Sequence, residues 1–504
     1  MLGQQAERGL SEREVKLAAA PSFRMPSPDE LVDGLAASTR EPERLSTTYL
    51  DSDDLRLARW GVSFRHRVGQ GWTVKLPPED AGALLVRPEL TFDGEGRRPP
   101  AEAVDLVRSF IRTAELRPQT RLRTVRRRIE LHDPEGSLLA DIADDEVSVL
   151  EGRRLAARFR ELEVEIREET PPGLLEALVN RLREAGAGAP DPTPKYIRAL
   201  GPRALQPPEV PIPELVSGAT AGDVVRRAIA SSVVRLIQHD PVVRLDTDPE
   251  GVHQARVATR RLRSDLRTFR PLIDPSWAAA LRDELGWLAG ALGAVRDADV
   301  LLARIGRRAA RLPESTGRGA LRVLAALESA RGEAYAELLT TLRTEPYLAL
   351  LDRLVAAGNA PSLLLESDLP AATVLPGLVR GPWRSLARRV KSLDRTPTDA
   401  ELHDVRIRTK RVRYAAEAVA PLVGKQARTF AAAAAALQDV LGDLNDAVVA
   451  ERWLRNWASR SRSLPGVFAA GELAGLESAA ADECRARWRT GWKELSSPRL
   501  RAWM

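Results

Sequence analysis

The sequence predicts an α+β multidomain protein: an N-terminal antiparallel β-barrel tunnel with flanking helices, then an all-α domain of two quasi-twofold-related helical bundles. Residues 12–166 alternate polar and apolar side chains with the period of two that strands require. Residues 201–217 contain five prolines and no periodicity, which is typical of a linker. Beyond this segment the pattern is helical, and it recurs after 150 residues. The expected boundaries are 1–200 for the first domain, 201–217 for the linker and 218–504 for the second domain, whose halves are about 218–365 and 366–504.

Composition limits the classes of function that the chain can have. Lys and Arg number 76 against 70 Asp and Glu, so any preference for anions must come from local clustering. Cys484 is the single cysteine, which excludes a disulfide framework and a Cys-rich zinc site. No apolar run approaches membrane-spanning length, and the N-terminus lacks a signal-peptide core. We therefore expect a cytoplasmic protein.

Charged side chains lie on one face of several predicted strands in the first domain. Acidic residues occur on the first and last strands, and basic residues occur on the strands between them. In any one strand this pattern fits a solvated face, but the order across five strands favours a barrel with a charged interior. Helices are expected at 27–37, 101–113 and 172–185. The strand-face residues are Glu12, Glu14, Lys16, Arg65, Arg67, Thr73, Lys75, Arg87, Glu89, Glu161, Glu163 and Glu165.

The arginine-rich strand at 121–131 leaves its register open. Arg126 and Arg128 share one face, and a shift of one residue would turn Arg123 or Arg127 inward instead. Carboxylates on two strands would hold a hard divalent cation through oxygen ligands. Arginines and lysines on the other strands would bind phosphate oxygens. The pattern therefore predicts a site for a metal ion and a phosphate compound.

The segment Glu12-Arg13-Glu14-Val15-Lys16 resembles the ExExK signature of the CYTH, or triphosphate tunnel metalloenzyme, superfamily. TTYLDSDDLRL, SFRHRVG, WTVKLP, ADIADDEV, RELEVEIRE and the element Thr193-Pro194-Lys195-Tyr196 are similar to its later motifs, in order. The resemblance covers about residues 10–200 and implies a hydrolase of the phosphohydrolase type that uses Mg²⁺ or Mn²⁺. It implies metal ligands at Glu12, Glu14, Glu163, Glu165 and Asp144, catalytic roles for Glu12, Glu14 and Lys16, and phosphate binding by Lys16, Arg65, Arg67, Lys75, Arg87, Arg126 and Lys195.

The second domain contains a predicted helix, 252–270, with one basic face. Its basic residues fall within roughly an 80° wedge at 100° per residue, and the wedge contains no acid. The opposite side is an apolar stripe that should be buried. An unbalanced positive face on a rigid helix indicates a polyanionic partner. These basic residues, which we call the first ladder, are His253, Arg256, Arg260, Arg263 and Arg267.

A second copy of this helix lies at 402–423, because 403 − 253 = 150. Its ladder is His403, Arg406, Lys410 and Arg413. An isolated histidine near a helix start would be explained by a backbone contact, but its recurrence above matching arginines favours a binding role. Leu441-Gly442 likewise parallels Leu292-Gly293 at an offset of 149. The duplication predicts a quasi-symmetric basic site.

Nucleic acid is the usual partner of basic patches, but aromatic residues make up only 5% of the chain and none interleave the ladders. VHQARVATRRLRS, LHDVRIRTKRVRY and LGAVRDADV resemble the motifs of the CHAD domain, a helical domain with conserved histidines, over about residues 218–504. This resemblance implies that both ladders bind inorganic polyphosphate, and it allows association with polyphosphate granules. The sequence does not indicate an oligomeric state.

Together the two resemblances predict an enzyme that hydrolyses inorganic triphosphate, fused to a polyphosphate-binding module. Two alternatives stay open: a non-catalytic protein that binds or targets polyphosphate, and a CYTH enzyme acting on an organic or nucleoside triphosphate.

Overall fold

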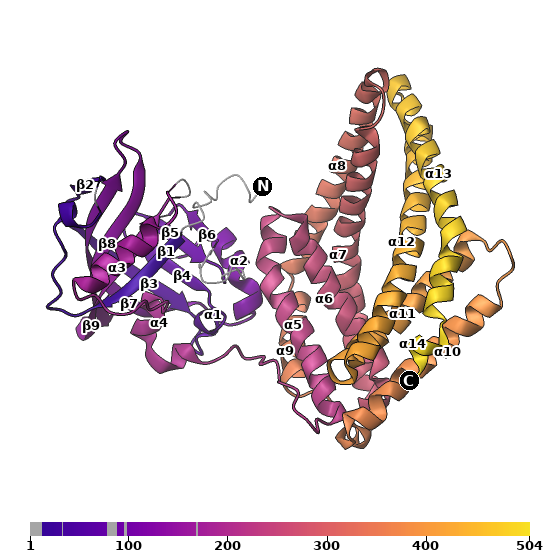
Figure 1. The fold of residues 1–504 in the computed structure, drawn as a ribbon, viewed down its shortest axis with the longest axis horizontal. Coiled ribbons are helices and arrows are strands. Elements are labelled where there is room, and N and C mark those ends of the chain that lie inside the picture. The colour runs from indigo at the N-terminus through magenta and orange to yellow at the C-terminus, as the bar shows by residue number, and fades with distance from the viewer. Residues whose placement is uncertain (1–12, 33, 78–87, 95–97, 168–169) are drawn as a thin grey trace. The chain divides into compact units, whose positions relative to one another are not determined.

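The computed structural model describes residues 13–32, 34–77, 88–94, 98–167 and 170–504, and the chain divides into two compact units between Glu209 and Val210 (Figure 1). The first unit contains one antiparallel sheet with flanking helices, and the second is helical. The predicted α+β multidomain class is therefore confirmed. Among the described residues, no helix combines the length and apolar character needed to cross a membrane.

The sheet has the strand order β1-β9-β8-β7-β3-β4-β5-β6, with β2 paired to β7. The sequence predicts a closed barrel, but in the described part of the chain no pairing joins β1 to β6, so the sheet is open. The strands are β1 Arg13–Ala19, β2 Ala36–Thr39, β3 Glu43–Asp51, β4 Ser63–Arg67, β5 Gly71–Lys75, β6 Glu89–Phe92, β7 Arg117–His132, β8 Leu138–Glu151 and β9 Arg154–Ile166.

One face of the sheet is apolar where β1, β9 and β8 meet. Leu17, Leu162 and Ile142 are fully buried there, together with Leu178 and Leu182 of helix α3. Because strand side chains alternate between faces, burial of this set turns the intervening charged residues to the opposite face. The helices of this unit are α1 Arg56–Arg59, α2 Ala101–Ile111, α3 Leu174–Glu184 and α4 Lys195–Leu200, with 3₁₀ turns at Pro28–Glu30 and Gly201–Leu205.

The helix predicted at 27–37 is wrong. The chain makes only the 3₁₀ turn Pro28–Glu30 and then enters β2. Gly34 lies between them with a φ of +82°, a left-handed conformation that breaks a helix and that glycine adopts without strain. The helices predicted at 101–113 and 172–185 correspond to α2 and α3.

The predicted linker is divided between the two units. The indole of Trp60 donates a 2.8 Å hydrogen bond to Glu209, and Arg112 forms a 2.6 Å ion pair with the same carboxylate. The next residue, Val210, is 2% exposed and packs in the helical unit near Gly358. The proline-rich segment is therefore anchored on both sides of the Glu209–Val210 bond.

The helical unit contains two successive sets of helices. In each set, two long helices form an antiparallel hairpin, α7–α8 and α12–α13 (Figure 1). Thr220 and Thr398 each cap a helix start through a capping box with the acid three residues later. The helices are α5 Ala221–Leu245, α6 Pro249–Thr268, α7 Pro275–Ala309, α8 Glu314–Leu342, α9 Glu345–Asn359, α10 Ala371–Lys391, α11 Asp399–Val423, α12 Lys425–Arg460, α13 Leu464–Leu495 and α14 Pro498–Arg501.

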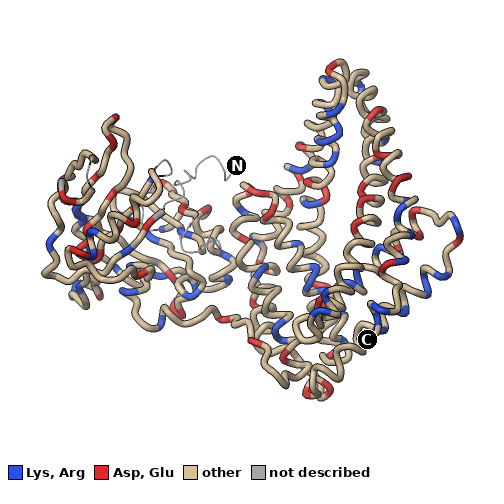
Figure 2. Tube along the Cα trace, in the orientation of Figure 1, with Lys and Arg blue, Asp and Glu red and all other residues tan. Residues whose placement is uncertain are grey.

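The two ladder helices, α6 and α11, pack against each other. Lys and Arg residues occur along the length of both helices (Figure 2). The apolar stripes expected on the other side are buried: Ala255 and Leu262 are at most 2% exposed, as are Val405 and Val412. The stripes anchor each helix in the core and leave its basic side available to other groups.

Candidate anion-binding sites

The first candidate site is one side of the sheet, which we call the charged face. Antiparallel register places Lys16 beside Glu163, and Arg126 beside Asp145, which in turn lies beside Glu161. Continuing across β3, β4 and β5, the same parity adds Arg65, Arg67 and Lys75. The charged face comprises Glu14, Lys16, Thr47, Tyr49, Arg65, Arg67, Lys75, Glu89, Arg126, Arg128, Asp141, Asp145, Glu161, Glu163 and Glu165.

Glu163 is the centre of this face. Its carboxylate lies 2.7 Å from Arg126, 3.0 Å from Lys195 and 3.5 Å from Lys16. Burial would raise its pKa, but these three cations hold the pKa of Glu163 well below its usual range. Lys16 also donates a 2.9 Å hydrogen bond to Glu14. Burial would lower the pKa of Lys16, but Glu163 and Glu14 outweigh burial and raise it.

Asp145, and not the predicted Asp144, lies on the charged face. Its carboxylate is fully buried and accepts two hydrogen bonds from Arg126, at 2.8 and 2.6 Å, and it is also paired with Lys195. Asp144 is turned to the other side of the sheet, where Arg160 binds both its oxygens at 2.8 Å. The placement of Asp144 among the metal-binding residues is therefore corrected, because adjacent strand residues point to opposite faces.

The other half of the face carries the basic strands. Arg65 and Lys75 both contact Glu89, at 2.9 and 2.5 Å. Arg67 instead donates to the hydroxyl of Thr47 at 3.2 Å, and burial, followed by the charges of Arg65 and Arg126, lowers its pKa to about 10. Arg67 is thus a partly buried cation that a phosphate oxygen would stabilise.

Strands β4 and β9 lie four steps apart in pairing order. Burial would lower the pKa of Arg65, but Tyr49, Glu89 and, from β9, Glu163 raise it. Basic and acidic strands therefore act on one another across the charged face even though the sheet is not closed.

The donor atoms of this face fit a hard divalent ion, since Glu14, Glu163 and Glu165 offer carboxylate oxygens. Glu161 is fully buried, and burial raises its pKa; its oxygens form no hydrogen bond but lie 3.3 Å from Lys195 and 3.5 Å from Arg198. Among the described residues, no three acidic or histidine side chains already converge as a metal-binding group. Glu12 and Arg87, both predicted for this site, lie outside the described residues.

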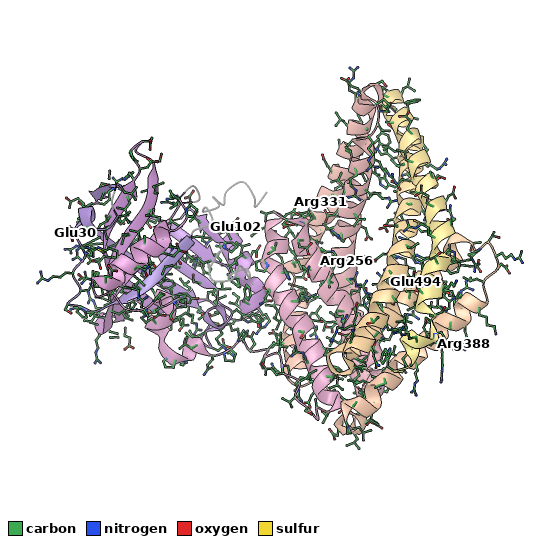
Figure 3. The ribbon with its side chains drawn as sticks, viewed as in Figure 1. Glu30, Glu102, Arg256, Arg331, Arg388 and Glu494 are labelled. Carbon is green, nitrogen blue, oxygen red and sulfur yellow. The ribbon has the colours of Figure 1, made fainter. Side chains whose placement is uncertain are left out.

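The second candidate site is a cavity of about 380 Å³ in the helical unit, which we call the basic cavity. It is bounded by the N-terminal halves of α6 and α11 and by the facing parts of α7 and α12 (Arg256 is labelled in Figure 3). Its polar lining consists of His253, Arg256, Arg260, Arg296, Asp297 and Arg304 from the first half and His403, Arg406, Lys410, Asn445 and Asp446 from the second.

The basic cavity holds cations that repel one another. Burial and the charges of Arg406, Arg260 and Arg256 lower the pKa of Lys410 to about 8. Burial and then Arg296 lower the pKa of His253. Asp297 offsets this repulsion only slightly, because its carboxylate is largely exposed where it lies 3.2 Å from Arg256. An anion entering the cavity would remove this repulsion.

A glycine on α7 leaves space for one ladder arginine. A Cβ atom at Gly293 would lie 2.5 Å from the guanidinium of Arg256, closer than real contacts allow. At Gly442, its counterpart on α12, a Cβ atom would lie an ordinary 3.9 Å from Arg406. Of the two glycines, only Gly293 therefore has a steric role toward its ladder arginine.

Three predicted ladder residues do not line the basic cavity. Arg413 lines a neighbouring cavity of about 500 Å³ and donates to Glu417 at 2.7 Å. Arg263 lies against Gly286 of α7, and Arg267 lies near Arg411 of α11. Sequence periodicity missed Arg296 and Arg304 because α7 approaches the cavity only after folding. The motif LGAVRDADV contains Arg296 and was the signal for it, whereas Arg304 lies beyond the motif.

Comparison with known proteins gives matches over both units. The CYTH domain matches residues 11–197, and the CHAD domain matches residues 227–455. Two uncharacterized proteins of Mycobacterium tuberculosis, MT2285 of strain CDC 1551 and Rv2226 of strain H37Rv, are each 30% identical over 512 residues, covering 95% of this chain and 94% of theirs.

Two solved structures are also similar. The CHAD domain of the plant Ricinus communis is 29% identical, with a TM-score of 0.47, over 56% of this chain and 94% of that one. PptA from Streptomyces chartreusis is 21% identical, with a TM-score of 0.46, over 55% of this chain and 100% of that one.

Proposed function

The chain belongs to the family that joins a CYTH domain to a CHAD domain, and from this we propose that its sheet unit hydrolyses inorganic triphosphate while its helical unit binds polyphosphate. CYTH domains are associated with metal-dependent phosphohydrolases of the tunnel type. The observation that carries the proposal is that one sheet face combines carboxylates on β1, β8 and β9 with Arg65, Arg67 and Lys75 on β4 and β5.

Triphosphate carries negative charge on every phosphoryl unit, so hydrolysis depends mainly on positioning and on charge stabilisation. In the proposed reaction Arg65, Arg67 and Lys75 bind the phosphate chain. Arg126 is held by two hydrogen bonds from its guanidinium to Asp145, so it presents a fixed positive charge without reorganisation. Lys16 acts in the same way, because its raised pKa keeps it protonated and excludes it as a general base at neutral pH.

Mg²⁺ or Mn²⁺ bound by Glu14, Glu163 and Glu165 would neutralise phosphate charge and make a bound water a better nucleophile. Lys16 and Lys195 already contact Glu163, so the carboxylates are balanced in charge before any ion arrives.

A non-catalytic phosphate receptor is the second candidate for the sheet unit. It is favoured by the ion pairs just described, since Glu14, Glu163 and Asp145 each contact lysine or arginine, and no described group of three acids forms a metal site. In that case the face would bind phosphate through its cations alone.

The deciding experiment measures phosphate release from triphosphate, ATP, thiamine triphosphate and long-chain polyphosphate, each with Mg²⁺, Mn²⁺ or EDTA. We expect metal-dependent release with triphosphate as the best substrate. Preference for ATP or thiamine triphosphate would show an enzyme acting on an organic triphosphate. Triphosphate binding without release under any metal condition would establish the receptor.

The helical unit is proposed to bind polyphosphate because the basic cavity gathers cations from two repeats in one place. A linear phosphate chain needs only closely spaced cations and no pocket for a base. Fusion to such a module would raise the local concentration of phosphate chains near the sheet unit. Isothermal titration with polyphosphate, and with single-stranded nucleic acid as competitor, tests this part; preferential binding of nucleic acid would contradict it.

A further inference from the structure

The internal repeat places equivalent residues on two flanks of the α6–α11 contact. Because the offset is 150, Arg261 corresponds to Arg411, and Glu417 corresponds to Arg267. The first flank, where Arg261 meets Glu417, is called the paired flank. The second, where Arg411 meets Arg267, is called the arginine flank. The 150-residue repeat relates the two positions, so their differences show what each flank is built to do.

Acids neutralise the facing arginines of the paired flank. Glu417 is ion-paired with Arg261 and also accepts a 2.7 Å hydrogen bond from Arg413. Asp265 is fully buried, with one carboxylate oxygen 3.4 Å from Arg261. At these equivalent positions two acids face two arginines, while Arg227, Arg235 and Arg260 also line the cavity at this flank.

On the arginine flank the same positions carry no acid. Asp265 corresponds to Ala415, Glu417 corresponds to Arg267, and Arg413 corresponds to Arg263. Helix α7 adds Arg282, whose Nε is buried without a hydrogen-bond partner. In the part of the chain that the structure describes, Arg263, Arg267, Arg282 and Arg411 form no ion pair with a carboxylate.

The four arginines are close enough to repel one another. Burial, followed by the charges of Arg411, Arg282 and Arg263, lowers the pKa of Arg267. The guanidinium of Arg263 lies beside α7, where a Cβ atom built on Gly286 would be in ordinary contact with it at 3.6 Å. Uncompensated like charges are unfavourable, and the paired flank shows that a glutamate is sterically tolerated at the equivalent position. The repulsion therefore indicates a ligand that supplies the missing negative charge.

The position of the flank connects it to the basic cavity. Arg256 and Arg260 line the cavity, and Arg263 and Arg267 follow on the same side of α6, one and two turns further along. On α11, the corresponding path from Lys410 leads to Arg413 and Glu417, which form an ion pair with each other.

We propose that a polyphosphate chain bound in the basic cavity continues along the arginine flank, over Arg263, Arg267, Arg282 and Arg411, and not along the paired flank. The chain is bound with one preferred direction although the helical unit is a near-symmetric duplication. This inference rests on the proposed binding of polyphosphate by the helical unit.

The test exchanges the charges of the two flanks. Arg267→Glu should pair with Arg411 as Glu417 pairs with Arg261, so the variant is expected to fold. Arg318→Glu, an exposed position on α8 with the same change in net charge, is the matched control. Affinity is measured for polyphosphate of graded length, at several salt concentrations, in the full-length chain.

Arg267→Glu is expected to weaken binding of long polyphosphate about tenfold or more, with little effect on chains that only fill the cavity. The slope of log K against log salt should fall by about 1.5, because two phosphate contacts are lost at about 0.7 each. Arg318→Glu should retain the wild-type slope. Glu417→Arg should leave long-chain affinity unchanged or raise it.

Equal losses in Arg267→Glu and Arg318→Glu, or a loss that is the same for short and long chains, would overturn the inference. Binding of single-stranded DNA in place of polyphosphate, with the same dependence on Arg267, would assign the flank to nucleic acid. Absence of polyphosphate binding by the wild-type chain would instead overturn the proposed function, so the two failures are distinguishable.

Discussion

Lysines in the two units respond to opposite surroundings. Lys16 and Lys195 in the sheet unit lie among carboxylates, and their pKa values are raised although burial would lower them. Lys410 in the helical unit lies among arginines, and burial together with these neighbours lowers its pKa to about 8. The same residue type is stabilised as a cation in one site and destabilised in the other.

The difference shows two ways of receiving a phosphate chain. The charged face contains both signs and is internally paired, so its charges are held in place before a ligand arrives, which suits a site that uses charge for a reaction. The basic cavity has mainly one sign and little compensation, so a ligand supplies what the folded chain lacks, which suits storage or capture. Each prediction below tests one side of this contrast.

The largest effect is expected from Glu163→Gln. Loss of this charge removes the partner of Lys16, Arg126 and Lys195, and phosphate release from triphosphate should fall by about 10²–10³-fold. Glu146→Gln, at an exposed residue paired with Arg127 on the opposite side of the sheet, is the control. Wild-type rates in Glu163→Gln, measured by phosphate assay, would show that the charged face is not the reactive site.

The double change Arg256→Ala/Arg406→Ala should weaken polyphosphate binding by on the order of 10²-fold, since each charge-assisted contact contributes about 1.5–3 kcal/mol. Titration calorimetry measures the effect. Arg455→Ala, at an exposed position paired with Glu451, should bind normally. Unchanged affinity in the double variant would remove the basic cavity as the binding site.

Polyphosphate affinity should fall as pH rises above about 8. In the free protein Lys410 loses its proton through that range, whereas a bound anion favours the charged form, so binding then requires proton uptake. The loss should approach tenfold per pH unit. Lys410→Arg, which stays charged, should give a flat profile from pH 7 to 9; a decline equal to that of the wild type would contradict the role of Lys410.

The smallest effect is expected on stability, from a change at Asp265, a buried acid in the helical unit. Burial, opposed by Arg261, raises its pKa to about 7, above the unfolded value near 3.9. The folded chain therefore binds an extra proton between these values, and stability falls as pH rises from about 4 to 7. Relative to wild type, Asp265→Asn should gain a few degrees in Tm at pH 8 compared with pH 5. A difference independent of pH would show that Asp265 stays charged.

Much of the fold could be predicted because the signals were local. Period-two alternation identified the faces of β1, β4, β5 and β9, and the 150-residue offset paired α6 with α11. The helix assigned to 27–37 failed because Gly34 and the pairing of β2 with β7 outweigh local periodicity. Closure of the sheet depends on contacts between its first and last strands, which alternation does not encode.

The site residues could not be predicted from sequence where strand register decides which face a side chain lies on. Asp144 and Asp145 are adjacent, and only the pairing of β8 with β9 shows that Asp145 shares the face of Glu163. The sequence predicts each ladder as a single surface. In the structure Arg256 lines the basic cavity and Arg267 does not, and Arg413 is paired with Glu417. Contributions from other helices, such as Arg304 of α7, depend on tertiary packing.

The anchoring of Glu209 and Val210 has a practical consequence for dissecting the protein. A fragment ending at residue 200 would strand Trp60 and Arg112 without the Glu209 carboxylate, and one beginning at residue 218 would expose the surface that Val210 covers. The proline-rich segment, which resembles a natural place to cut, is therefore a poor one over most of its length. To express the two units separately, the chain is best cut at the 209–210 bond. The sheet unit then keeps Glu209, and the helical unit keeps Val210.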